Sequence, residues 1–550
     1  MDKILTQLLS KIDYIKIDGK VDTDIKISSL VFDTRQVKDG SLFFALPGTH
    51  VHGNKFICKA IELGAVAVIY QDELPEDAKL VAEKKEVVFI QVKDSRFAMS
   101  PISDEFFDYP SSKMGIIGIT GTEGKSSTVF FTWQLLRLIG KKAGFISTVQ
   151  YSLGDEAIDN PEHQTTPEAP IIQEKLYRML QNGCEYAVVE SSSHGLSVKT
   201  NRLGNVAFDA VAMMNVTHEH LEFHGTHEQY KSDKANLFRA LDKFNHTKEL
   251  ISGKVEFSPF GLVNAEDPSS PYFAQATKCD VFGFSAVGCA GNKGDNQVDI
   301  FENAKSFAGL IQAVDVNSTK NSCSCNLLID TKEDFATKEN HFFINFTGSF
   351  NIYNVLTSAM LVSKLTKTEF GKVLEQTENL VAVKGRMTSV NKGQDFEVIV
   401  DYAHTPSSFE TIFPPLRKRC KGKIISLFGS GGERDTKKRS VQGQIASKWC
   451  DIVILADEDP RGEDSVELLE MIASGCKDEN GNFLKREERL YIIPDRKKAI
   501  RKAFSLCQKD DIVLLLGKAH ENSIIYKDFV MPYDEISEAE KALSEMGFNK

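Results

Sequence analysis

Apolar and polar positions follow a regular order along this chain, in which short apolar runs are separated by longer stretches of helical spacing. Short apolar runs bounded by polar or glycine-rich turns are typical of buried strands. The segments expected to form strands are 41–46, 65–70, 87–92, 114–119, 186–189, 210–214, 397–400, 423–428, 452–455, 490–493 and 512–516. Because helix-like stretches such as 129–138 and 230–238 lie between them, the pattern predicts an α/β protein with parallel sheets.

The predicted elements fall into three blocks, as expected for a chain of 550 residues, which exceeds what one hydrophobic core usually serves. The expected domains are residues 1–111, 112–381 and 382–550. The last has the strand pattern of a doubly wound, Rossmann-like sheet. We interpret Asp108–Lys113 as a linker, and within the less readable region 241–345 we expect 288–296 and 317–326 to be surface loops or an insertion.

Composition narrows the class of protein. With 41% hydrophobic and 26% charged residues, the chain has the make-up of a soluble globular protein. Its net charge of −11 argues against a nucleic-acid partner, which would require a basic surface. Ten scattered cysteines without a Cys-x-x-Cys pair suit a reducing cytosol. No signal peptide and no membrane span is evident, so we expect a cytoplasmic protein without membrane insertion.

The strongest chemical signal is the segment Gly121–Ser126, which joins the apolar strand 114–119 to a helical pattern. Glycines let backbone N–H groups turn toward phosphate oxygens, Lys125 can reach the outer phosphates, and the Ser126 hydroxyl can hold Mg²⁺. The usual phosphate-loop pattern has a glycine where this chain has Ile119, so the loop is a shorter variant. The alternative is a plain strand–turn–helix corner. The residues expected to contact nucleotide phosphates are Gly121, Thr122, Gly124, Lys125, Ser126 and Ser127.

Two later strand ends carry further candidates. Glu190 ends the strand 186–189, where a carboxylate can bind Mg²⁺ directly or through water. His218, His220 and His224 follow the strand 210–214, and a metal-free polar loop or a zinc site are alternative interpretations. No cysteine lies nearby, so a closed zinc site has little support. Lys234 has no special role from spacing alone.

In this order the segments resemble the Mur ligase family, and most closely its E-type members, almost from end to end. The segments that carry the resemblance are Phe32–Val37, Gly121–Ser126, Thr165–Pro167, Val189–Leu196, Asn215–Gly225, Tyr230–Lys234, Gly385–Met387, Asp401–Pro406, Phe428–Arg439 and Gly517–Glu521. The resemblance implies an N-terminal domain that binds a uridine nucleotide, a central ATP-binding domain with a P-loop type of parallel sheet, and a C-terminal domain that binds an amino acid.

The resemblance also implies roles for individual residues. Catalytic roles fall on Lys125, Glu190, His220, Lys234 and Arg386. Mg²⁺ would be held by Ser126, Glu190, His220 and a carbamylated Lys234. Further ATP contacts are implied for Asn264, Asn351, Asn354, Asp401 and His404. The UDP-muramoyl-peptide would contact Asp33, Arg35, Thr165, Thr166, Ser193 and Arg202. The incoming amino acid would contact Arg434, Glu458, Asp459, Arg461, Gly517 and Glu521.

The implied reaction is amide formation driven by ATP through an acyl phosphate, in cytoplasmic synthesis of peptidoglycan precursors. Small molecules alone would be the partners: ATP, UDP-N-acetylmuramoyl-L-alanyl-D-glutamate and a diamino acid, with a monomer expected. Arg461 suits the distal carboxylate of meso-diaminopimelate, whereas the anion of Asp459 suits the distal ammonium of lysine or ornithine. Arg461 could instead pair with Asp459 or Glu458 as a structural ion bridge. The residues favour diaminopimelate slightly.

Two other functions are compatible with parts of the pattern. A folylpolyglutamate synthase has a similar phosphate loop but lacks the N-terminal segment and the Asp401–Pro406 motif. A P-loop binding protein that lost its chemistry is the other alternative. Glu123, the acid inside the phosphate loop, fits none of these interpretations and should face away from phosphates.

Overall fold

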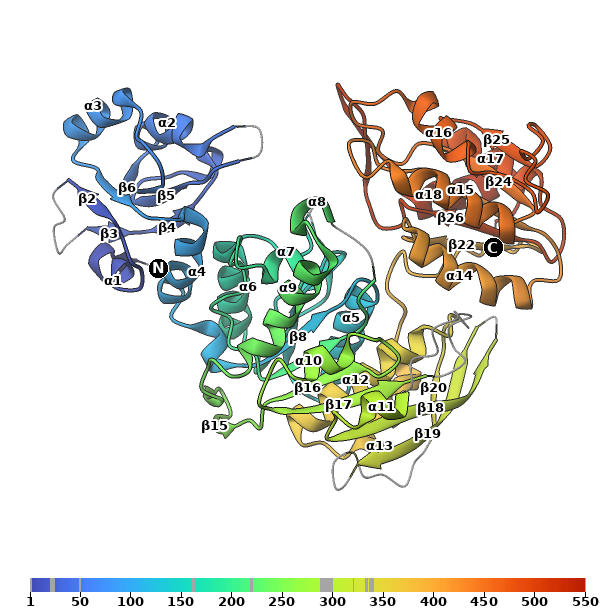
Figure 1. The fold of residues 1–550 in the computed structure, drawn as a ribbon, viewed down its shortest axis with the longest axis horizontal. Helices are drawn as coiled ribbons and strands as arrows, with labels where there is room; N and C mark the ends of the chain where they lie inside the picture. Colours follow the sequence, from blue (N-terminus) through green and yellow to red (C-terminus); the bar gives the residue numbers. More distant parts are fainter. Residues whose placement is uncertain are drawn as a thin grey trace.

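The computed structural model describes residues 2–19, 25–48, 51–160, 164–217, 221–286, 300–319, 321–331, 335 and 341–549. Three large sheets follow one another along the chain, and Figure 1 shows them as three lobes coloured blue, green to yellow, and orange to red. The expected three-part α/β architecture is confirmed, while the boundaries after residues 111 and 381 stay predictions. None of the helices in the described ranges has the length and apolar character that a membrane crossing requires.

The N-terminal sheet has the strand order β2-β7-β6-β5-β4, in which only β2 is antiparallel to its neighbour. Its strands are β2 (Lys16–Asp18), β4 (Ser29–Val31), β5 (Ser41–Ala45), β6 (Ala65–Tyr70) and β7 (Val88–Gln91). Its helices are α1 (Leu5–Leu9), α2 (Ile57–Glu62), α3 (Glu76–Lys85) and α4 (Ser95–Phe106). A short ladder pairs β1 (Lys3–Ile4) with β3 (Lys26–Ile27). The three strands predicted here are confirmed, and their continuous apolar runs reflect burial on both faces.

The central sheet has eleven strands in the order β11-β10-β9-β12-β8-β13-β16-β17-β18-β19-β20. The strands from β9 to β18 are parallel, and the antiparallel pairs lie at the two edges. The strands are β8 (Gly115–Thr120), β9 (Ala143–Ile146), β10 (Gln150–Ser152), β11 (Ile158–Asp159), β12 (Tyr186–Glu190), β13 (Ala210–Met213), β16 (Phe260–Asn264), β17 (Asp280–Ser285), β18 (Gly309–Ser318), β19 (Cys323–Thr331) and β20 (His341–Ile344). A separate hairpin joins β14 (Thr247–Leu250) to β15 (Gly253–Glu256).

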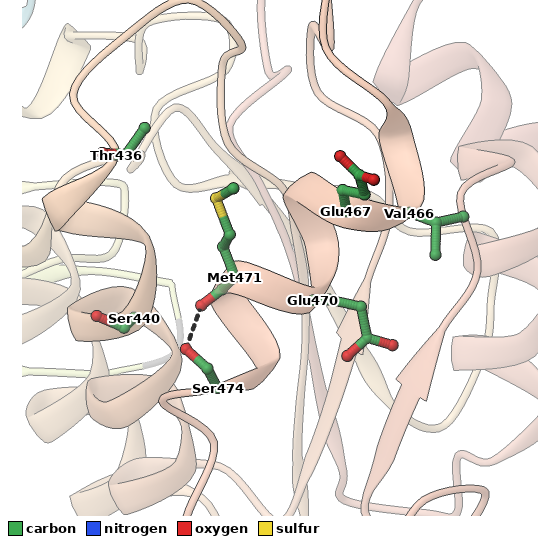
Figure 2. A pocket seen from close by; sticks show the side chains of 7 residues that line it. All are labelled: Thr436, Ser440, Val466, Glu467, Glu470, Met471 and Ser474. Carbon is green, nitrogen blue, oxygen red and sulfur yellow. Dashed lines mark hydrogen bonds between the residues drawn. The ribbon is translucent and has the colours of Figure 1, made fainter.

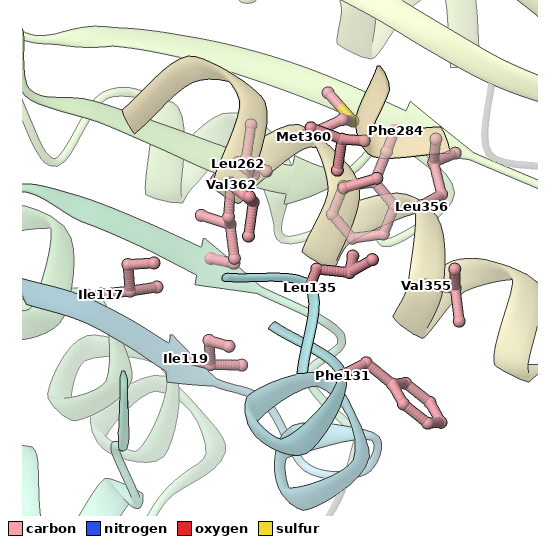
Figure 3. Packing of buried hydrophobic residues seen from close by; sticks show 14 of the residues in the cluster. Ile117, Ile119, Phe131, Leu135, Leu262, Phe284, Val355, Leu356, Met360 and Val362 are labelled. Atoms are coloured by element: carbon pink, nitrogen blue, oxygen red, sulfur yellow. The ribbon is translucent and has the colours of Figure 1, made fainter. Parts of the chain in front are cut away.

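Helices cover both faces of the central sheet. They are α5 (Lys125–Leu138), α6 (Ala169–Gln181), α7 (Ser193–Leu196), α8 (Leu221–His224), α9 (His227–Ala240), α10 (Ser270–Ala274), α11 (Ile300–Ala304), α12 (Asn351–Thr366) and α13 (Phe370–Leu374). Alternate side chains of β8 point to opposite faces, so Ile117 and Ile119 pack in the cluster that contains α5 and α12 (Figure 3), whereas Ile116 packs with α6 and α9. Strand β8 is therefore buried on both sides, and this positions the loop that follows it.

The C-terminal sheet has the strand order β21-β22-β26-β23-β24-β25, parallel except for β21. Its strands are β21 (Thr388–Ser389), β22 (Glu397–Asp401), β23 (Ile424–Phe428), β24 (Ile452–Leu455), β25 (Leu490–Ile492) and β26 (Ile512–Leu516), beside a hairpin of β27 (Ser523–Ile525) and β28 (Val530–Pro532). The helices are α14 (Pro406–Arg419), α15 (Lys437–Trp449), α16 (Ser465–Ala473), α17 (Arg496–Ser505) and α18 (Glu535–Glu545). The first three pack on one face and the last two on the other, which confirms the doubly wound arrangement.

One expectation about the irregular region was wrong. Residues 317–326 were expected to form a surface loop or insertion, but they include the end of β18 and the start of β19, which pair as an antiparallel hairpin. Cys323, Cys325 and Leu327 are buried on one face, while Ser324 and Asn326 alternate with them. The polar side chains of this alternating pattern were mistaken for loop residues. The other polar stretch, 288–296, lies outside the described residues.

Candidate active site

The phosphate loop lies between the buried strand β8 and the first residue of α5. Gly124, just before the helix, has φ of +82°, and a Cβ atom there would lie 2.8 Å from the Asn354 Oδ1 atom. Asn354 comes from α12. Its side-chain oxygen accepts a hydrogen bond from the Thr128 hydroxyl at 3.2 Å, and its amide donates to the Asn351 side chain at 3.1 Å. Both predicted asparagines of α12 therefore lie beside the beginning of α5.

Two lysines direct their ammonium groups at this loop. The Lys125 Nζ atom donates to the Thr122 carbonyl at 2.8 Å, and the Lys234 Nζ atom donates to the Gly121 carbonyl at 2.6 Å. Lys234 is only 2% exposed, on α9 beneath the loop. The Asn215 side chain accepts hydrogen bonds from the backbone of Thr122 (3.0 Å) and Glu123 (2.8 Å). These contacts give the loop a defined shape, and the Lys125 ammonium supplies positive charge beside it, as binding of phosphates requires.

Glu190 is the acidic centre of the site. It ends β12, is 1% exposed, and its Oε1 atom accepts a hydrogen bond from the Ser126 hydroxyl at 3.0 Å. Ser147 and Thr148, which follow the neighbouring strand β9, donate to the same carboxylate at distances of 2.6 to 3.0 Å. A carboxylate and hydroxyl oxygens beside a phosphate loop are the donors that Mg²⁺ prefers. These residues therefore fit the ion; His220, predicted as a further ligand, lies outside the described residues.

A second set of predicted residues lies directly behind Glu190. The Thr166 hydroxyl donates to the Glu190 carbonyl at 3.0 Å, and Arg202 donates to the Thr166 carbonyl at 2.8 Å and to Glu168 at 2.9 Å. Glu168 also pairs with Arg96 of the N-terminal domain. Thr165, next in sequence to Thr166, is partly exposed. This group connects the N-terminal domain to the strand end that carries Glu190.

Ser193 and His224 form a buried pair nearby. The His224 ring contacts the Ser193 hydroxyl at 3.1 Å through Nε2 and the Asp233 carboxylate at 2.8 Å through Nδ1. Because both ring nitrogens are engaged in this way, His224 positions Ser193 and is not placed as a metal ligand. His218 lies outside the described residues.

The remaining predicted substrate contacts of the first two domains lie at separate places. Asp33 and Arg35, in the N-terminal domain, pair with each other, with Arg35 Nε 2.9 Å from Asp33 Oδ2, and the guanidinium lowers the pKa of Asp33. Asn264, at the end of β16, donates to the Met214 carbonyl at 3.0 Å, two strands from β8. Ser127 is buried in the first turn of α5.

The start of the C-terminal domain holds three predicted residues close together. Both oxygens of the Asp401 carboxylate accept backbone N–H groups, from Met387 and Ala403, each at 2.7 Å, and burial raises the pKa of this carboxyl. The Arg386 guanidinium lies over the Tyr402 ring, 4.7 Å from its centre, and His404 Nδ1 lies 2.8 Å from the Tyr402 carbonyl. As placed, Asp401 organises the turn that carries Arg386.

The predicted amino-acid contacts gather at the ends of β24 and β26. The Asp459 Oδ1 atom accepts hydrogen bonds from the Lys518 ammonium (2.8 Å) and the Ile525 backbone (2.9 Å), and Lys518 also pairs with Glu521. Gly517 has φ of +96°, and a Cβ atom there would lie 2.8 Å from Glu458 Oε2. Three acids thus surround a single buried lysine.

Two groups in this cluster lack internal partners. Within the described residues, Glu458 Oε2 and Arg461 Nε are enclosed without a hydrogen-bond partner. Burial raises the pKa of Glu458 and of Glu521. Among the described residues, no ion pair joins Arg461 to Asp459 or Glu458, and Asp459 pairs with Lys518 instead. Arg434 is exposed on the loop after β23.

The structure adds residues that sequence reasoning missed: Ser147, Thr148, Glu168, Asn215 and Lys518. Ser147 and Thr148 follow a buried apolar run, which is the signal shared by every other strand-end candidate. Asn215, Glu168 and Lys518 lie inside or next to segments already singled out, but nothing in their spacing shows which neighbours they contact.

An open hollow on the C-terminal domain lies away from these strand ends. It is formed between α15 and α16 (Figure 2), and its lining residues are Thr436, Ser440, Val466, Glu467, Glu470, Met471 and Ser474. None of the predicted site residues lines it.

Comparison with known proteins agrees with this geometry. Family descriptions match in three consecutive parts: "Mur ligase family, catalytic domain" at 26–107, "Mur ligase middle domain" at 119–362, and "Mur ligase, glutamate ligase domain" at 385–519. The chain belongs to the Mur ligase family. It is accordingly a ligase of peptidoglycan synthesis that depends on ATP and Mg²⁺.

Individual relatives cover nearly the whole chain. The UDP-N-acetylmuramyl-tripeptide synthetase of Treponema denticola is 52% identical over 532 residues, 94% of each chain. The UDP-N-acetylmuramoyl-L-alanyl-D-glutamate–2,6-diaminopimelate ligase of Caldanaerobacter subterraneus is 32% identical over 98% of this chain and 99% of its own. A solved structure of a diaminopimelate ligase of the same name matches with a TM-score of 0.59 at 22% identity over 100% of both chains, which supports the fold.

Proposed function

We propose that this ligase extends UDP-N-acetylmuramoyl-L-alanyl-D-glutamate by one diamino acid, forming an amide at a free carboxylate of the dipeptide. The convergence of Lys125, Lys234 and Glu190 on one phosphate loop is the observation that carries the proposal. The names of the T. denticola and C. subterraneus relatives support the same substrate class.

The chemistry requires the carboxylate to be activated before an amine attacks it. Transfer of the γ-phosphoryl group of ATP to the carboxylate gives an acyl phosphate; the amine attacks its carbonyl carbon, and phosphate leaves. Lys125 neutralises charge on the transferred phosphoryl group, and the loop N–H groups orient it. Ser126 and Glu190 would hold Mg²⁺, which would neutralise charge that develops on the phosphates. We propose that Arg202 and Thr166, which lie behind Glu190, orient the muramoyl-peptide beside the loop; their mutual contacts near that strand end support this role.

We propose further that Lys234 is carbamylated in the active enzyme. Its position supports this: the Nζ atom is buried 2.6 Å from the loop carbonyl of Gly121, where a carbamate would exchange a cation for an anion facing the Mg²⁺ side. Mass spectrometry of the intact protein, with and without bicarbonate, tests it. Absence of a 44-dalton adduct together with activity that is independent of bicarbonate would contradict it.

For the acceptor we propose meso-diaminopimelate. Arg461 keeps an enclosed Nε without a partner, which suits the distal carboxylate, and Asp459 is already neutralised by Lys518. An Asp459 free of cations would instead have suited the distal ammonium of lysine or ornithine. The name of the C. subterraneus relative points the same way, whereas the name of the T. denticola relative specifies no acceptor.

The test is phosphate release by the purified protein with ATP, Mg²⁺, the UDP-muramoyl-dipeptide and each diamino acid in turn. We expect turnover only when the dipeptide is present, and Arg461→Ala is expected to lower kcat/KM for diaminopimelate about 100-fold, an energy of about 2.7 kcal/mol, with little change for lysine. Equal effects on both acceptors would exclude the carboxylate role. Turnover that needs no muramoyl-peptide, or none at all, would favour a folylpolyglutamate-type ligase or a binding protein.

We place this reaction in the cytoplasm, catalysed by a monomer. The described cysteines are free thiols, which suits a reducing compartment. Light scattering of the purified protein tests the oligomeric state.

A further inference from the structure

The acid inside the phosphate loop contacts the C-terminal domain. The Glu123 Oε1 atom accepts a hydrogen bond from the Thr405 hydroxyl at 3.1 Å, although the two residues are separated by 282 positions in sequence. Thr405 stands immediately before α14, the first helix of the C-terminal domain. The carboxylate is therefore directed across the domain boundary.

Both ends of this hydrogen bond are held by further contacts. Asn215 accepts from the Glu123 backbone N–H at 2.8 Å and donates to its carbonyl at 3.3 Å, so the central domain fixes the backbone on both sides of the acid. Thr405 is the N-cap of α14 and shares a capping box with Ser408, whose backbone N–H lies 3.1 Å from the Thr405 hydroxyl oxygen. Because each domain holds the Glu123 backbone or the Thr405 side chain through its own contacts, less conformational entropy is lost when the two meet.

The position of Thr405 decides what the contact can do. Asp401 and His404 lie just before it, and Asp401 holds the turn that carries Arg386. Docking Thr405 on the phosphate loop therefore brings this segment of the C-terminal domain to the nucleotide end of the central domain. The hydrogen bond also keeps the Glu123 carboxylate directed at the Thr405 hydroxyl and away from phosphate oxygens.

We infer that Glu123 is a positioning residue, which docks segment 401–405 on the phosphate loop and so aligns the C-terminal domain for the ligation step. The inference rests on the proposed function for its kinetic readout, but the contact itself is independent of which diamino acid is added. Glu123 acts through Thr405 and takes no part in proton or phosphoryl transfer.

A double-mutant cycle tests the inference. Glu123→Ala and Thr405→Val are each expected to lower kcat/KM for the diamino acid about tenfold, an energy of about 1.4 kcal/mol. The double variant is expected to be no worse than Thr405→Val alone, because that variant already lacks the contact with Glu123, together with the N-cap hydrogen bond from Ser408. Glu123→Gln is expected to stay within about threefold of the unaltered enzyme, since its amide oxygen accepts the same hydrogen bond.

Hydrogen exchange of the peptide 401–408 gives a readout that does not depend on activity. Glu123→Ala is expected to speed exchange there and leave exchange in β8 unchanged. Ser407→Ala, on the same turn of α14, is the matched control for the hydroxyl that Thr405→Val removes. Additive kinetic effects in the cycle, or unchanged exchange in Glu123→Ala, would overturn the inference. If no diamino acid is ligated but exchange still responds, the proposed function fails and the docking role stands.

Discussion

The phosphate loop and the acid-rich end of the C-terminal domain are both built at the carboxyl ends of parallel strands, but they hold their polar groups in different ways. In the phosphate loop, Lys125, Lys234 and Asn215 bond to backbone groups of one short segment. At the C-terminal end, Lys518 pairs with Asp459 from another strand end and with Glu521 on its own loop. The first site presents backbone geometry and positive charge to a phosphate, whereas the second holds a fixed arrangement of charges, on which our proposal for the acceptor rests.

The two ends also differ in whether their polar side chains have hydrogen-bond partners inside the protein. Glu190 accepts four hydrogen bonds from Ser126, Ser147 and Thr148, so both oxygens of this carboxylate have partners inside the protein. Within the part of the chain that the structure describes, Glu458 and Arg461 each keep an enclosed polar atom without a partner. Enclosed polar atoms without partners are costly, and a ligand that supplies the missing hydrogen bonds removes that cost. We therefore expect substitutions at the two ends to affect different kinetic constants.

The largest effect should come from the phosphate loop. Lys125→Ala removes the charge that faces the transferred phosphoryl group, and we expect kcat/KM for ATP to fall about 1,000-fold with every acceptor alike. Phosphate release measured with diaminopimelate and with lysine checks this. The melting temperature should change little, because Lys125 is partly exposed. A loss confined to one acceptor would break the proposed separation between the two ends.

A smaller and selective effect is expected at Lys518. Lys518→Met leaves Asp459 and Glu521 without their shared cation, so the site should favour an acceptor with a distal ammonium and no distal carboxylate. We expect the ratio of kcat/KM for diaminopimelate to that for lysine to fall about tenfold. Lys518→Arg, which keeps the charge, is the control, and thermal unfolding of both variants shows whether loss of a buried cation has disturbed the fold. An unchanged ratio in a folded Lys518→Met protein would contradict the charge-pattern interpretation.

The smallest effect concerns pH. Burial raises the pKa of Glu458 above the ordinary value of 4.5, so the folded protein takes up a proton at a pH where the unfolded chain is still ionised. The charged form that attracts an ammonium group is therefore lost as the pH falls through the raised pKa, and the KM for the diamino acid should rise a few-fold. The contribution of Glu458 to the stability of the fold has the opposite trend. That contribution is present below the pKa of this carboxyl in the unfolded chain, and it is lost as the pH rises through the raised pKa of the folded protein.

Glu458→Gln should flatten both dependences. In this variant we expect the KM for the diamino acid to stay constant as the pH falls. We also expect the melting temperature of the variant, relative to that of the unaltered protein, to be higher at pH 8 than at pH 5. Steady-state kinetics and thermal unfolding across pH 5–8 measure both. A parallel pH dependence of the KM for ATP would show that the titrating group is not confined to the C-terminal end.

Sequence patterns predicted strands such as β6 and β24 because each is a local apolar run buried on both faces. The similarly buried β9, β16 and β17 were not among the expected strands. The phosphate loop was predictable for a related reason: its glycines, lysine and serine are contiguous, and their backbone geometry is set by their neighbours in sequence. The strand β19 was missed because one of its faces is polar. The partner of Lys518 was also out of reach, since 59 residues separate it from Asp459.

The amino-acid sequence by itself therefore determined the three α/β units, the phosphate loop and the family resemblance, all of which depend on short-range order. Only the tertiary structure decided that Lys518 neutralises Asp459, that Arg461 keeps an unpartnered donor, and that Glu123 reaches Thr405. Each of these depends on which strand ends and helix ends meet in space. The energy of a charge or a hydrogen bond depends on distance and burial, which spacing along the chain does not specify.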